Sequence, residues 1–229
     1  MNCCQCQGIE EFFNRQVAER QLADYRKRGP DRTTRLLIEA LKGQGVRGAT
    51  LLDIGGGIGA IQHALLQAGT ASAQDVDASQ AYLRAAQEEA ERGGYAERIQ
   101  FRHGNFVELA SQVKPADIVT LDRVICCYPD MDKMVRLSSA KARRLYGLVY
   151  PRDGRGAKLG IRIINALMRL RGTPFRIFIH PSQEVESLIH QEGFQRIAYA
   201  QTAIWQMAVY LRPENQYNNE YALPHAAIG

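Results

Sequence analysis

The chain has 229 residues, of which 45% are hydrophobic and 23% are charged, and its formal net charge is +5. This length and composition predict one substantial core, in a single domain with a small N-terminal extension. No apolar run reaches the roughly 20 residues that are needed to span a bilayer. The N-terminus also lacks a basic region followed by an apolar segment, so we expect a cytoplasmic protein.

Positive charge is concentrated in one part of the chain. Between Arg136 and Arg176 there are eleven Lys and Arg residues and one acid, so this segment carries +10 and the remainder −5. Such a concentration of one sign bears on the partners of the protein rather than on its fold.

The five cysteines are Cys3, Cys4, Cys6, Cys126 and Cys127. Their odd number and spacing do not form a secreted disulfide framework, so we expect reduced thiols. The first three could offer thiolates to a metal, but structural zinc prefers two separate Cys pairs. The sequence therefore predicts no metal site.

Residues 1–46 are predicted to form a helical extension or lid ahead of the core. Apolar residues recur at mostly helical spacing from Ile9 to Arg28, and Gly29-Pro30 ends that pattern. A second helix is expected from Asp31 to Lys42.

The first core strand runs into a glycine-rich turn. The apolar run 51–54 contains Asp53 and is followed by glycines at four of the next five positions, which include Gly55, Gly57 and Gly59. Glycine permits positive φ and leaves no Cβ between backbone and ligand. A helix is expected from Ala60 to Gly69, so the pattern predicts a strand, a nucleotide-binding turn and a helix.

Two classes of cofactor use this arrangement. The spacing Gly55-x-Gly57-x-x-Ala60 fits the dinucleotide fingerprint, in which pyrophosphate lies at the helix N-terminus. The pattern of Asp53, Gly55, Gly57 and Gly59 instead places a carboxylate just ahead of the turn, which disfavours pyrophosphate and favours a cationic ligand. S-adenosylmethionine (SAM) carries an ammonium and a sulfonium, and this motif resembles the first motif of class I SAM-dependent methyltransferases.

Two more turns extend the proposed cofactor site. A strand at 71–77 ends in Asp77, which lies 24 residues after Asp53, near the spacing at which an acid receives ribose hydroxyls. Ser79 is the expected N-cap of the helix 80–92. A third strand, 98–103, leads to Asn105 and Phe106. The resemblance assigns these two residues to adenine, although the class usually has an acid where Asn105 stands.

The segment after the fourth strand narrows the resemblance. That strand covers 116–122, and residues 121–129 resemble the corresponding segment of magnesium-protoporphyrin O-methyltransferases. The resemblance implies that Asp122 borders the cofactor, that Arg123 contacts the substrate and that Tyr128 takes part in catalysis. Cys127 stands where that family commonly has a histidine.

The next elements lead into the basic segment. A helix is predicted over 131–144 and a fifth strand over 144–150. A basic helical insertion follows at about 154–172, with Arg155, Lys158, Arg162, Asn165 and Arg169 on one face and Ile163, Leu167 and Leu170 on another. This helix could receive an anionic substrate, rest on an anionic membrane surface, contact RNA phosphates, or present a merely solvated face.

The chain is predicted to close with an extended stretch, a helix and two strands. Residues 175–181 are expected to be extended and to reach Ser182, the predicted N-cap of a helix over 184–192. From the porphyrin-family resemblance we assign Arg176 to the substrate and His180 to catalysis. Strands are expected at 195–200 and 203–211.

Together these elements predict an α/β fold, with a Rossmann-like seven-stranded methyltransferase sheet. The sheet is mostly parallel, its last strand is antiparallel, and helices cover both faces. The methyltransferase domain is expected to span 47–213, ahead of a tail at 214–229.

The leading functional hypothesis is a SAM-dependent O-methyltransferase. Its acceptor would be an anionic small molecule, such as a tetrapyrrole-like carboxylate, and the basic helix would supply peripheral membrane contact. The alternatives are an RNA methyltransferase, an NAD-dependent oxidoreductase and a noncatalytic cofactor-binding regulator. RNA is less favoured, because no known RNA-binding motif is present.

Overall fold

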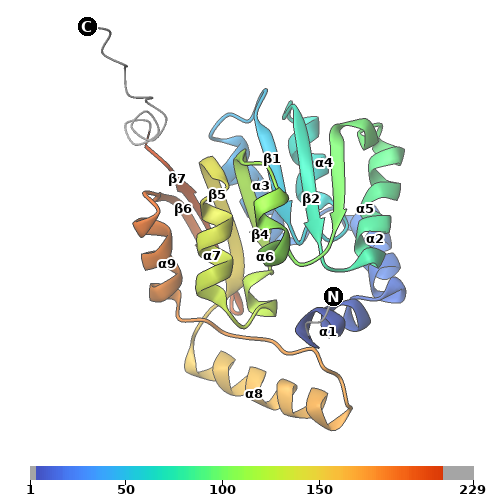
Figure 1. The fold of residues 1–229 in the computed structure, drawn as a ribbon, viewed down its shortest axis with the longest axis vertical. Helices are drawn as coiled ribbons and strands as arrows, with labels where there is room; N and C mark the ends of the chain where they lie inside the picture. The colour runs from blue at the N-terminus through green and yellow to red at the C-terminus, as the bar shows by residue number, and fades with distance from the viewer. Residues whose placement is uncertain (1–3, 214–229) are drawn as a thin grey trace, which may run out of the picture.

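A computed structural model describes residues 4–213, with side chains from Gly8 onward, and shows a central sheet between two layers of helices (Figure 1). The strands are β1 (Thr50–Ile54), β2 (Ser72–Asp77), β3 (Ile99–His103), β4 (Ala116–Asp122), β5 (Ala142–Pro151), β6 (Gln195–Gln201) and β7 (Trp205–Leu211). Their order is β3-β2-β1-β4-β5-β7-β6, and β7 runs antiparallel to both of its neighbours. This confirms the predicted sheet, including the antiparallel last strand.

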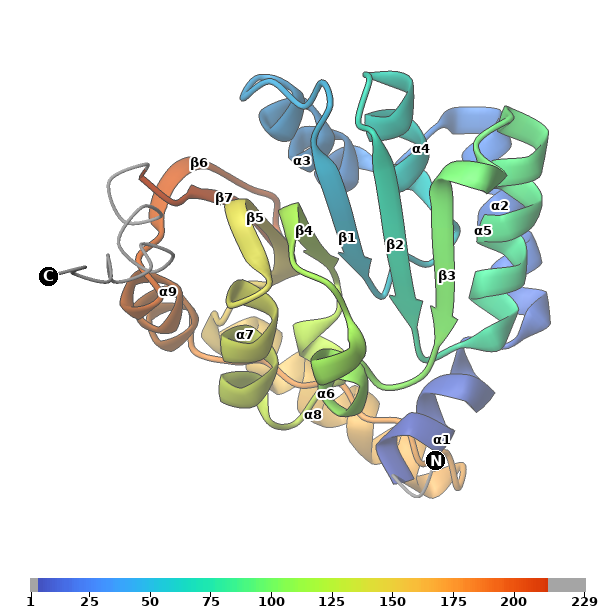
Figure 2. The ribbon, with the colours of Figure 1, turned by 45° about the horizontal axis from the view of Figure 1, so that its top comes forward.

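Helices cover both faces of the sheet (Figure 2). They are α1 (Cys4–Phe12), α2 (Arg15–Arg28), α3 (Arg32–Lys42), α4 (Ala60–Gln67), α5 (Gln80–Gly93), α6 (Phe106–Leu109), α7 (Met131–Ser139), α8 (Arg155–Leu170) and α9 (Ser182–Gln191). One core cluster joins the sheet to α6, α7 and α9. The other joins it to α3 and α4, and α2 packs on α5.

The switch in strand order between β1 and β4 positions the site. Strands β2 and β3 extend the sheet to one side of β1, and β4 and β5 extend it to the other. The loops after β1 and β4 therefore diverge at the carboxyl edge, which is where open α/β sheets bind ligands. Leu52 and Ile54 are buried against one layer and Leu51 against the other, so β1 is anchored from both faces.

The first predicted helix of the N-terminal extension is two helices in the structure. The pattern from Ile9 to Arg28 breaks between α1 and α2, because Asn14 caps α2. Its side chain accepts hydrogen bonds from the backbone N–H groups of Gln16 (3.0 Å) and Val17 (3.3 Å). Asn favours a cap over a helix interior, since its short amide competes with the helical backbone bonds.

The predicted helix 131–144 is also too long. Helix α7 ends at Ser139, where the hydroxyls of Ser138 and Ser139 bond the carbonyls of Met134 and Val135, each at 2.7 Å. Such back-bonding weakens a helix, and the chain then enters β5 by pairing Ala142 with the start of β4.

Ser182 does not cap α9 as predicted. It is the first residue of that helix, and Pro181 occupies the cap position without a side-chain bond. The Ser182 hydroxyl instead donates to Asp153 (3.0 Å) and accepts from the Gln206 amide (2.7 Å). This serine therefore ties α9 to β7 and to the chain that follows β5.

The stretch 175–181 is extended but joins no strand. Two contacts hold it: the Phe178 N–H donates to the Cys126 carbonyl (2.7 Å), and Asn165 of α8 bonds both backbone groups of Ile177. Asn165 thus faces the protein and does not share an exposed face with the arginines of α8.

Some predictions fall outside the described residues. These are the tail 214–229 and the side chains of Cys3, Cys4 and Cys6. Over the part that the structure describes, no helix is long and apolar enough to cross a membrane. Within that same part, no three His, Cys, Asp or Glu side chains group so that they could hold a metal ion.

Candidate active site

A cavity of about 810 Å³ lies at the carboxyl edge of β1, β2 and β4. Its walls come from the glycine turn, the ends of β2 and β4, the loop before α6, helices α1 and α2, the start of α3 and the start of β7. A cavity of this size lies in the range that binds cofactors and small ligands.

The turn after β1 has the backbone that its glycines predict. Gly55, Gly57 and Gly59 have φ values of 64°, 59° and 80°. A Cβ at Gly55 would lie 2.5 Å from Cγ2 of Val124, and one at Gly56 would lie 2.3 Å from Nε2 of Gln62. Gly55 and Gly57 line the cavity, whereas Gly59 lies outside the lining and is the left-handed N-cap of α4.

Asp53 lies beneath this turn and not in the cavity wall. Its carboxylate accepts hydrogen bonds from the Thr120 hydroxyl (2.6 Å) and the Gln62 amide (3.3 Å). Burial raises the pKa of Asp53 to about 7, although these two bonds oppose the shift. The structure therefore makes Asp53 a support of the turn, and contact with the cofactor remains a prediction.

Asp77 lines the cavity and holds two backbone segments together. Its carboxylate accepts from the N–H of Gly57 (3.0 Å) in the turn and of Ser79 (2.7 Å) at the start of α5. Ser79 caps α5 as predicted. Burial raises the pKa values of Asp77 and of its neighbour Asp75, and the Asp77 charge adds to the shift of Asp75.

Asn105 and Phe106 lie where β3 leads into α6, and both line the cavity. The Asn105 side chain caps α6: its oxygen accepts from the N–H of Val107 (3.1 Å), and its amide donates to Glu108 (3.2 Å). An amide oxygen has two lone pairs, so the cap leaves one for a ligand.

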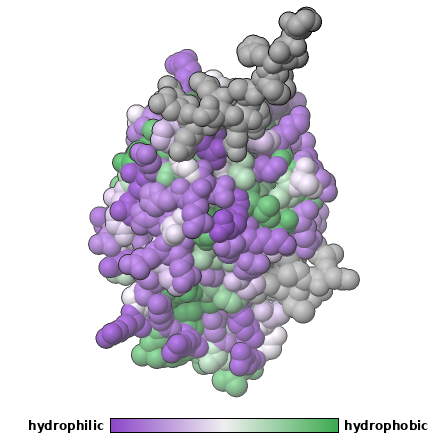
Figure 3. All heavy atoms as spheres, turned by 60° about the vertical axis from the view of Figure 1, so that its left-hand side comes forward, coloured by the Kyte–Doolittle hydropathy of each residue, from purple (hydrophilic) through white to green (hydrophobic). Residues whose placement is uncertain are grey.

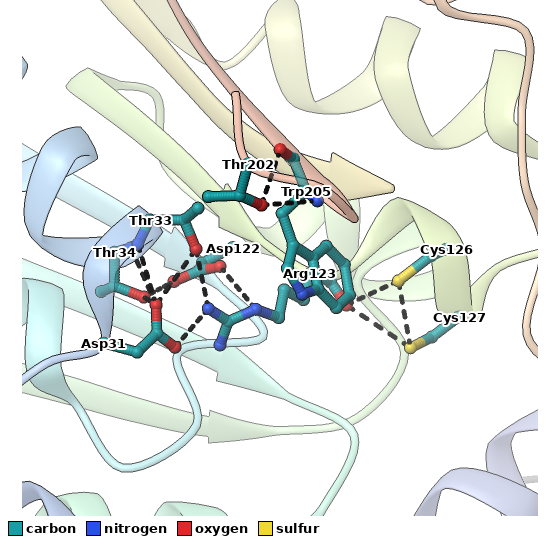
Figure 4. A network of polar contacts seen from close by, with 9 residues as sticks. All are labelled: Asp31, Thr33, Thr34, Asp122, Arg123, Cys126, Cys127, Thr202 and Trp205. Carbon is teal, nitrogen blue, oxygen red and sulfur yellow. Dashed lines mark hydrogen bonds and ion pairs between the residues drawn. The ribbon is translucent and has the colours of Figure 1, made fainter. Parts of the chain in front are cut away.

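Arg123 is the centre of a polar network after β4 (Figure 4). Among the described residues it is the only non-glycine with positive φ, at 62°. Its guanidinium donates to Asp31 and to the Thr33 hydroxyl (2.9 Å), and its central carbon lies 5.1 Å from the centre of the Trp205 ring. Arg123 thus links β4 to the start of α3 and to β7, and the sequence did not indicate either link.

Asp122 completes this network. The Thr34 hydroxyl donates to its carboxylate, and Nε of Arg123 lies 3.7 Å from its other oxygen. Burial raises the pKa of Asp122, and the Arg123 charge opposes that shift. Asp122 and Arg123 both line the cavity, as the sequence suggested.

The residues assigned to catalysis and substrate separate into two groups. Tyr128 lines the cavity, but Arg176 and His180 do not. Nε2 of His180 lies 2.9 Å from the carbonyl of Ile125 and 3.0 Å from that of Tyr128. Arg176 donates to the carbonyl of Phe175 (2.6 Å). Both side chains bond backbone groups of the wall, so their direct roles remain predictions.

An aromatic wall closes the cavity opposite the sheet. The ring centres of Phe12 and Phe175 lie 4.6 Å apart in a stacked pair, and Phe13 packs edge-on against Phe175 at 5.4 Å. The carbonyl of Phe13 also accepts from the Ser79 hydroxyl (2.7 Å). The sequence missed this wall, because Phe175 lies far along the chain from Phe12 and Phe13 and only the apolar character of the three residues was visible.

The ionisable groups in the cavity wall and beneath the glycine turn fit a cationic cofactor. Four carboxyl groups gather at the strand ends around the turn, on Asp53, Asp75, Asp77 and Asp122, and burial raises the pKa of each. A pyrophosphate would meet like charge here, whereas an ammonium and a sulfonium would relieve it. The glycine turn adds close backbone approach, so the residues present fit SAM better than a dinucleotide.

Comparisons with known proteins agree with this geometry. Residues 46–222 match the family model described as a methyltransferase domain. No curated protein sequence matches the chain.

Solved structures share the fold at low sequence identity. Magnesium protoporphyrin IX methyltransferase from Synechocystis PCC 6803 with bound SAH has a TM-score of 0.71 at 19% identity, over 91% of this chain and 100% of that one. The same protein with bound SAM has a TM-score of 0.68 at 16% identity, over 91% and 97%.

A putative sarcosine dimethylglycine methyltransferase from Galdieria sulphuraria has a TM-score of 0.63 at 15% identity, over 79% of this chain and 85% of that one. The match to the family model covers most of the chain and includes every strand of the sheet. The chain therefore belongs to the methyltransferase-domain family, as a class I SAM-dependent methyltransferase.

Proposed function

We propose that this protein transfers the methyl group of SAM to an oxygen of an anionic small molecule with a large apolar body. A tetrapyrrole-like carboxylate is such a molecule. The observation that carries the proposal is the composition of the cavity, which runs from the glycine turn to the aromatic wall and has Arg123 in its lining. Aromatic rings would receive the apolar body, and a guanidinium would attract the carboxylate.

The proposed cofactor contacts follow the three turns at the sheet edge. Gly55 and Gly57 would bring backbone next to the methionine part of SAM, with Asp53 providing negative charge from below. Asp77 would receive the ribose hydroxyls. Asn105 would accept from the adenine amino group while Phe106 packs on the ring.

The acceptor side needs little acid–base chemistry. SAM supplies a methyl group with a good leaving group, so the protein contributes mainly by positioning the acceptor and excluding water. A carboxylate is already ionised at neutral pH and can attack without a general base. We propose that Tyr128 contacts the acceptor and that His180 positions it by holding the Tyr128 carbonyl.

Label transfer from SAM with a tritiated methyl group tests the proposal. Porphyrin carboxylic acids should gain label that mild alkali releases, as expected for a methyl ester, and the matching porphyrin methyl esters should gain none. Label that resists alkali would overturn the carboxylate acceptor, and label in RNA would support the RNA alternative. If the protein binds SAM and labels no fraction of a cell extract, the noncatalytic regulator is the better reading.

Membrane contact forms part of the same proposal. The segment 154–172 carries five Lys and Arg residues and no acid, which would attract it to an anionic surface.

A further inference from the structure

Helix α8 lies apart from the sheet, below its carboxyl edge in Figure 1. One row of its residues is less exposed than the others and turns toward the protein. No residue of α8 is fully buried. Ala157, Ile161, Asn165 and Met168 are half-buried, at spacings of four, four and three that place them on one stripe. Asn165 fixes this orientation, because its amide donates to the Ile177 carbonyl (2.7 Å) and accepts from the Ile177 N–H (3.0 Å).

The opposite row of α8 is apolar and faces outward. It consists of Leu159, Ile163, Leu167 and Leu170, which have the same four, four, three spacing and are 60%, 55%, 49% and 83% exposed. Figure 3 shows hydrophobic side chains gathered at the lower end of the molecule, the end that α8 occupies. Isolated exposed leucines are ordinary, but a continuous row along one helix marks a contact surface.

Cations lie along the border of this row. Arg155, Arg162 and Arg169 repeat every seven residues beside it, and Lys158 follows the same side. All four side chains are exposed, and α8 contains no acid. Long cationic side chains in this position can reach outward past the leucines, so charge and apolar surface meet the same partner.

We infer that α8 is a surface anchor whose apolar row inserts into an anionic lipid layer. The polar–apolar pattern, with cations at the border and aliphatic residues in the centre, is the one that interfacial helices use. A protein partner is less favoured, because leucine is under-represented among the anchors of protein interfaces and α8 has no aromatic residue. At 16 residues the helix is about 24 Å long, too short to span a bilayer but long enough to lie along its surface.

The anchor is coupled to the cavity, and this part of the inference rests on the proposed function. Ile177, which Asn165 clamps to α8, lines the cavity, as does Phe175 on the same connecting stretch. The backbone of Phe175 also packs so closely on α1 that a Cβ at Gly8 would lie 2.5 Å from its nitrogen. With α8 on the membrane, the aromatic wall would lie close to the lipid, and an acceptor that partitions into lipid could enter there.

Sedimentation of the full chain with lipid vesicles tests the anchor. The protein should bind phosphatidylcholine vesicles that contain phosphatidylglycerol, and should bind pure phosphatidylcholine at least about tenfold more weakly, with salt weakening the first case. Ile163→Gln with Leu167→Gln should lower binding by about tenfold or more without changing net charge. The matched control is Ile197→Gln with Ile204→Gln, two exposed isoleucines on the sheet side, which should bind as the unmodified protein does.

The outcomes separate the anchor from the enzyme. Absence of vesicle binding, or equal loss in the control pair, would overturn the anchor even if methyl transfer occurs, and an acidic protein would then be the occupant to seek. Vesicle binding by a protein that transfers no methyl group would keep the anchor and overturn the proposed function. SAM affinity and circular dichroism, unchanged in both pairs, would show that the variants are folded.

Discussion

Removing the Arg123 side chain tests whether the network in Figure 4 holds the cavity together. Arg123→Ala deletes the bonds to Asp31 and Thr33, the ion pair with Asp122 and the packing on Trp205. The bonds to Asp31 and Thr33 join the start of α3 to the end of β4, and the packing on Trp205 joins β7 to it. We therefore expect lower stability, and weaker order at the start of α3 in particular.

The size of the loss follows from the environment of each partner. Hydrogen bonds to charged groups contribute about 1.5–3 kcal/mol, and stacking of a guanidinium on an indole contributes about 0.5–2 kcal/mol. Asp122 is only partly exposed, but its raised pKa lets it take up a proton when its partner is lost. The Asp31 side chain is half exposed, and solvent screens its share. A net loss of about 2–4 kcal/mol in the free energy of unfolding is expected.

A double-mutant cycle isolates the link to α3. Asp31→Asn removes the charge but keeps an N-cap acceptor for the N–H groups of Thr33 and Thr34. Urea unfolding of the two single variants and the double variant should give a coupling energy of about 0.5–1.5 kcal/mol between Arg123 and Asp31. A coupling energy below about 0.3 kcal/mol would refute the link.

A glycine at position 123 provides the control for the backbone. Arg123 has φ of 62°, which costs any residue with a Cβ and costs glycine little. Arg123→Gly should therefore be about 1 kcal/mol more stable than Arg123→Ala, although both lack the side chain. If the glycine variant is the less stable of the two, the backbone strain has no energetic role.

Three further variants test Asp77 and Asp53 near the proposed cofactor site, and Glu89 of α5, which pairs with Arg26 and Arg92. Asp77→Ala should weaken SAM binding in calorimetry by about tenfold or more, since it loses the proposed ribose acceptor and the bond to Gly57, and unchanged affinity would reject the assignment. Burial raises the pKa of Asp53 from 3.8 to about 7, so unfolding free energy should fall as pH rises from about 4 through 7, and Asp53→Asn should flatten this slope in urea titrations. Bonds from Arg92 and Arg26 lower the pKa of buried Glu89 from 4.5 to about 2, so its stabilisation, present above pH 4.5, is lost as pH falls toward 2. Glu89→Gln should remove that dependence and cost about 1–3 kcal/mol at pH 7, and an unaltered acid profile would contradict the assignment.

The sequence predicted the elements whose signals are local. The strand, glycine turn and helix around Gly57 follow from neighbouring residues, and so does the cap at Ser79. Asp77 was assigned from its place at the end of the second strand, 24 residues after Asp53, and from the resemblance to the methyltransferase class. In each case, one short stretch carries both the fold and its functional residue.

The sequence could not show contacts between distant residues. Arg123 and Asp31 are 92 positions apart, and Trp205 is separated from Arg123 by most of the second half of the sheet. The positive φ of Arg123 could not be predicted either, because that backbone conformation is expected at glycine. The place of His180 in the sequence also could not show that its side chain bonds the backbone of the cavity wall. Those hydrogen bonds depend on how the stretch 175–181 is held.

The orientation of helix α8 is another feature that the sequence could not show. Its spacing identifies an amphipathic helix, and that prediction agrees with the structure. Which side of an amphipathic helix faces the protein is decided elsewhere, here by the two bonds between Asn165 and Ile177. Both rows of this helix contain apolar residues, so Asn165 and its bonds to Ile177 decide which row faces inward.

The replacement of the usual acid by Asn105 is consistent with the charges around it. Strand β3 pairs His103 with Asp77, and Asn105 follows His103 by two residues. The buried carboxylate of Asp77, whose pKa is already raised, therefore lies near position 105. A further carboxylate at position 105 would add like charge there, and it would also repel Glu108, to which the Asn105 amide now donates. The asparagine keeps an acceptor oxygen while adding no charge. Under the proposed function, this departure from the family pattern keeps an acceptor for adenine and leaves the negative charge at the end where a cation would bind.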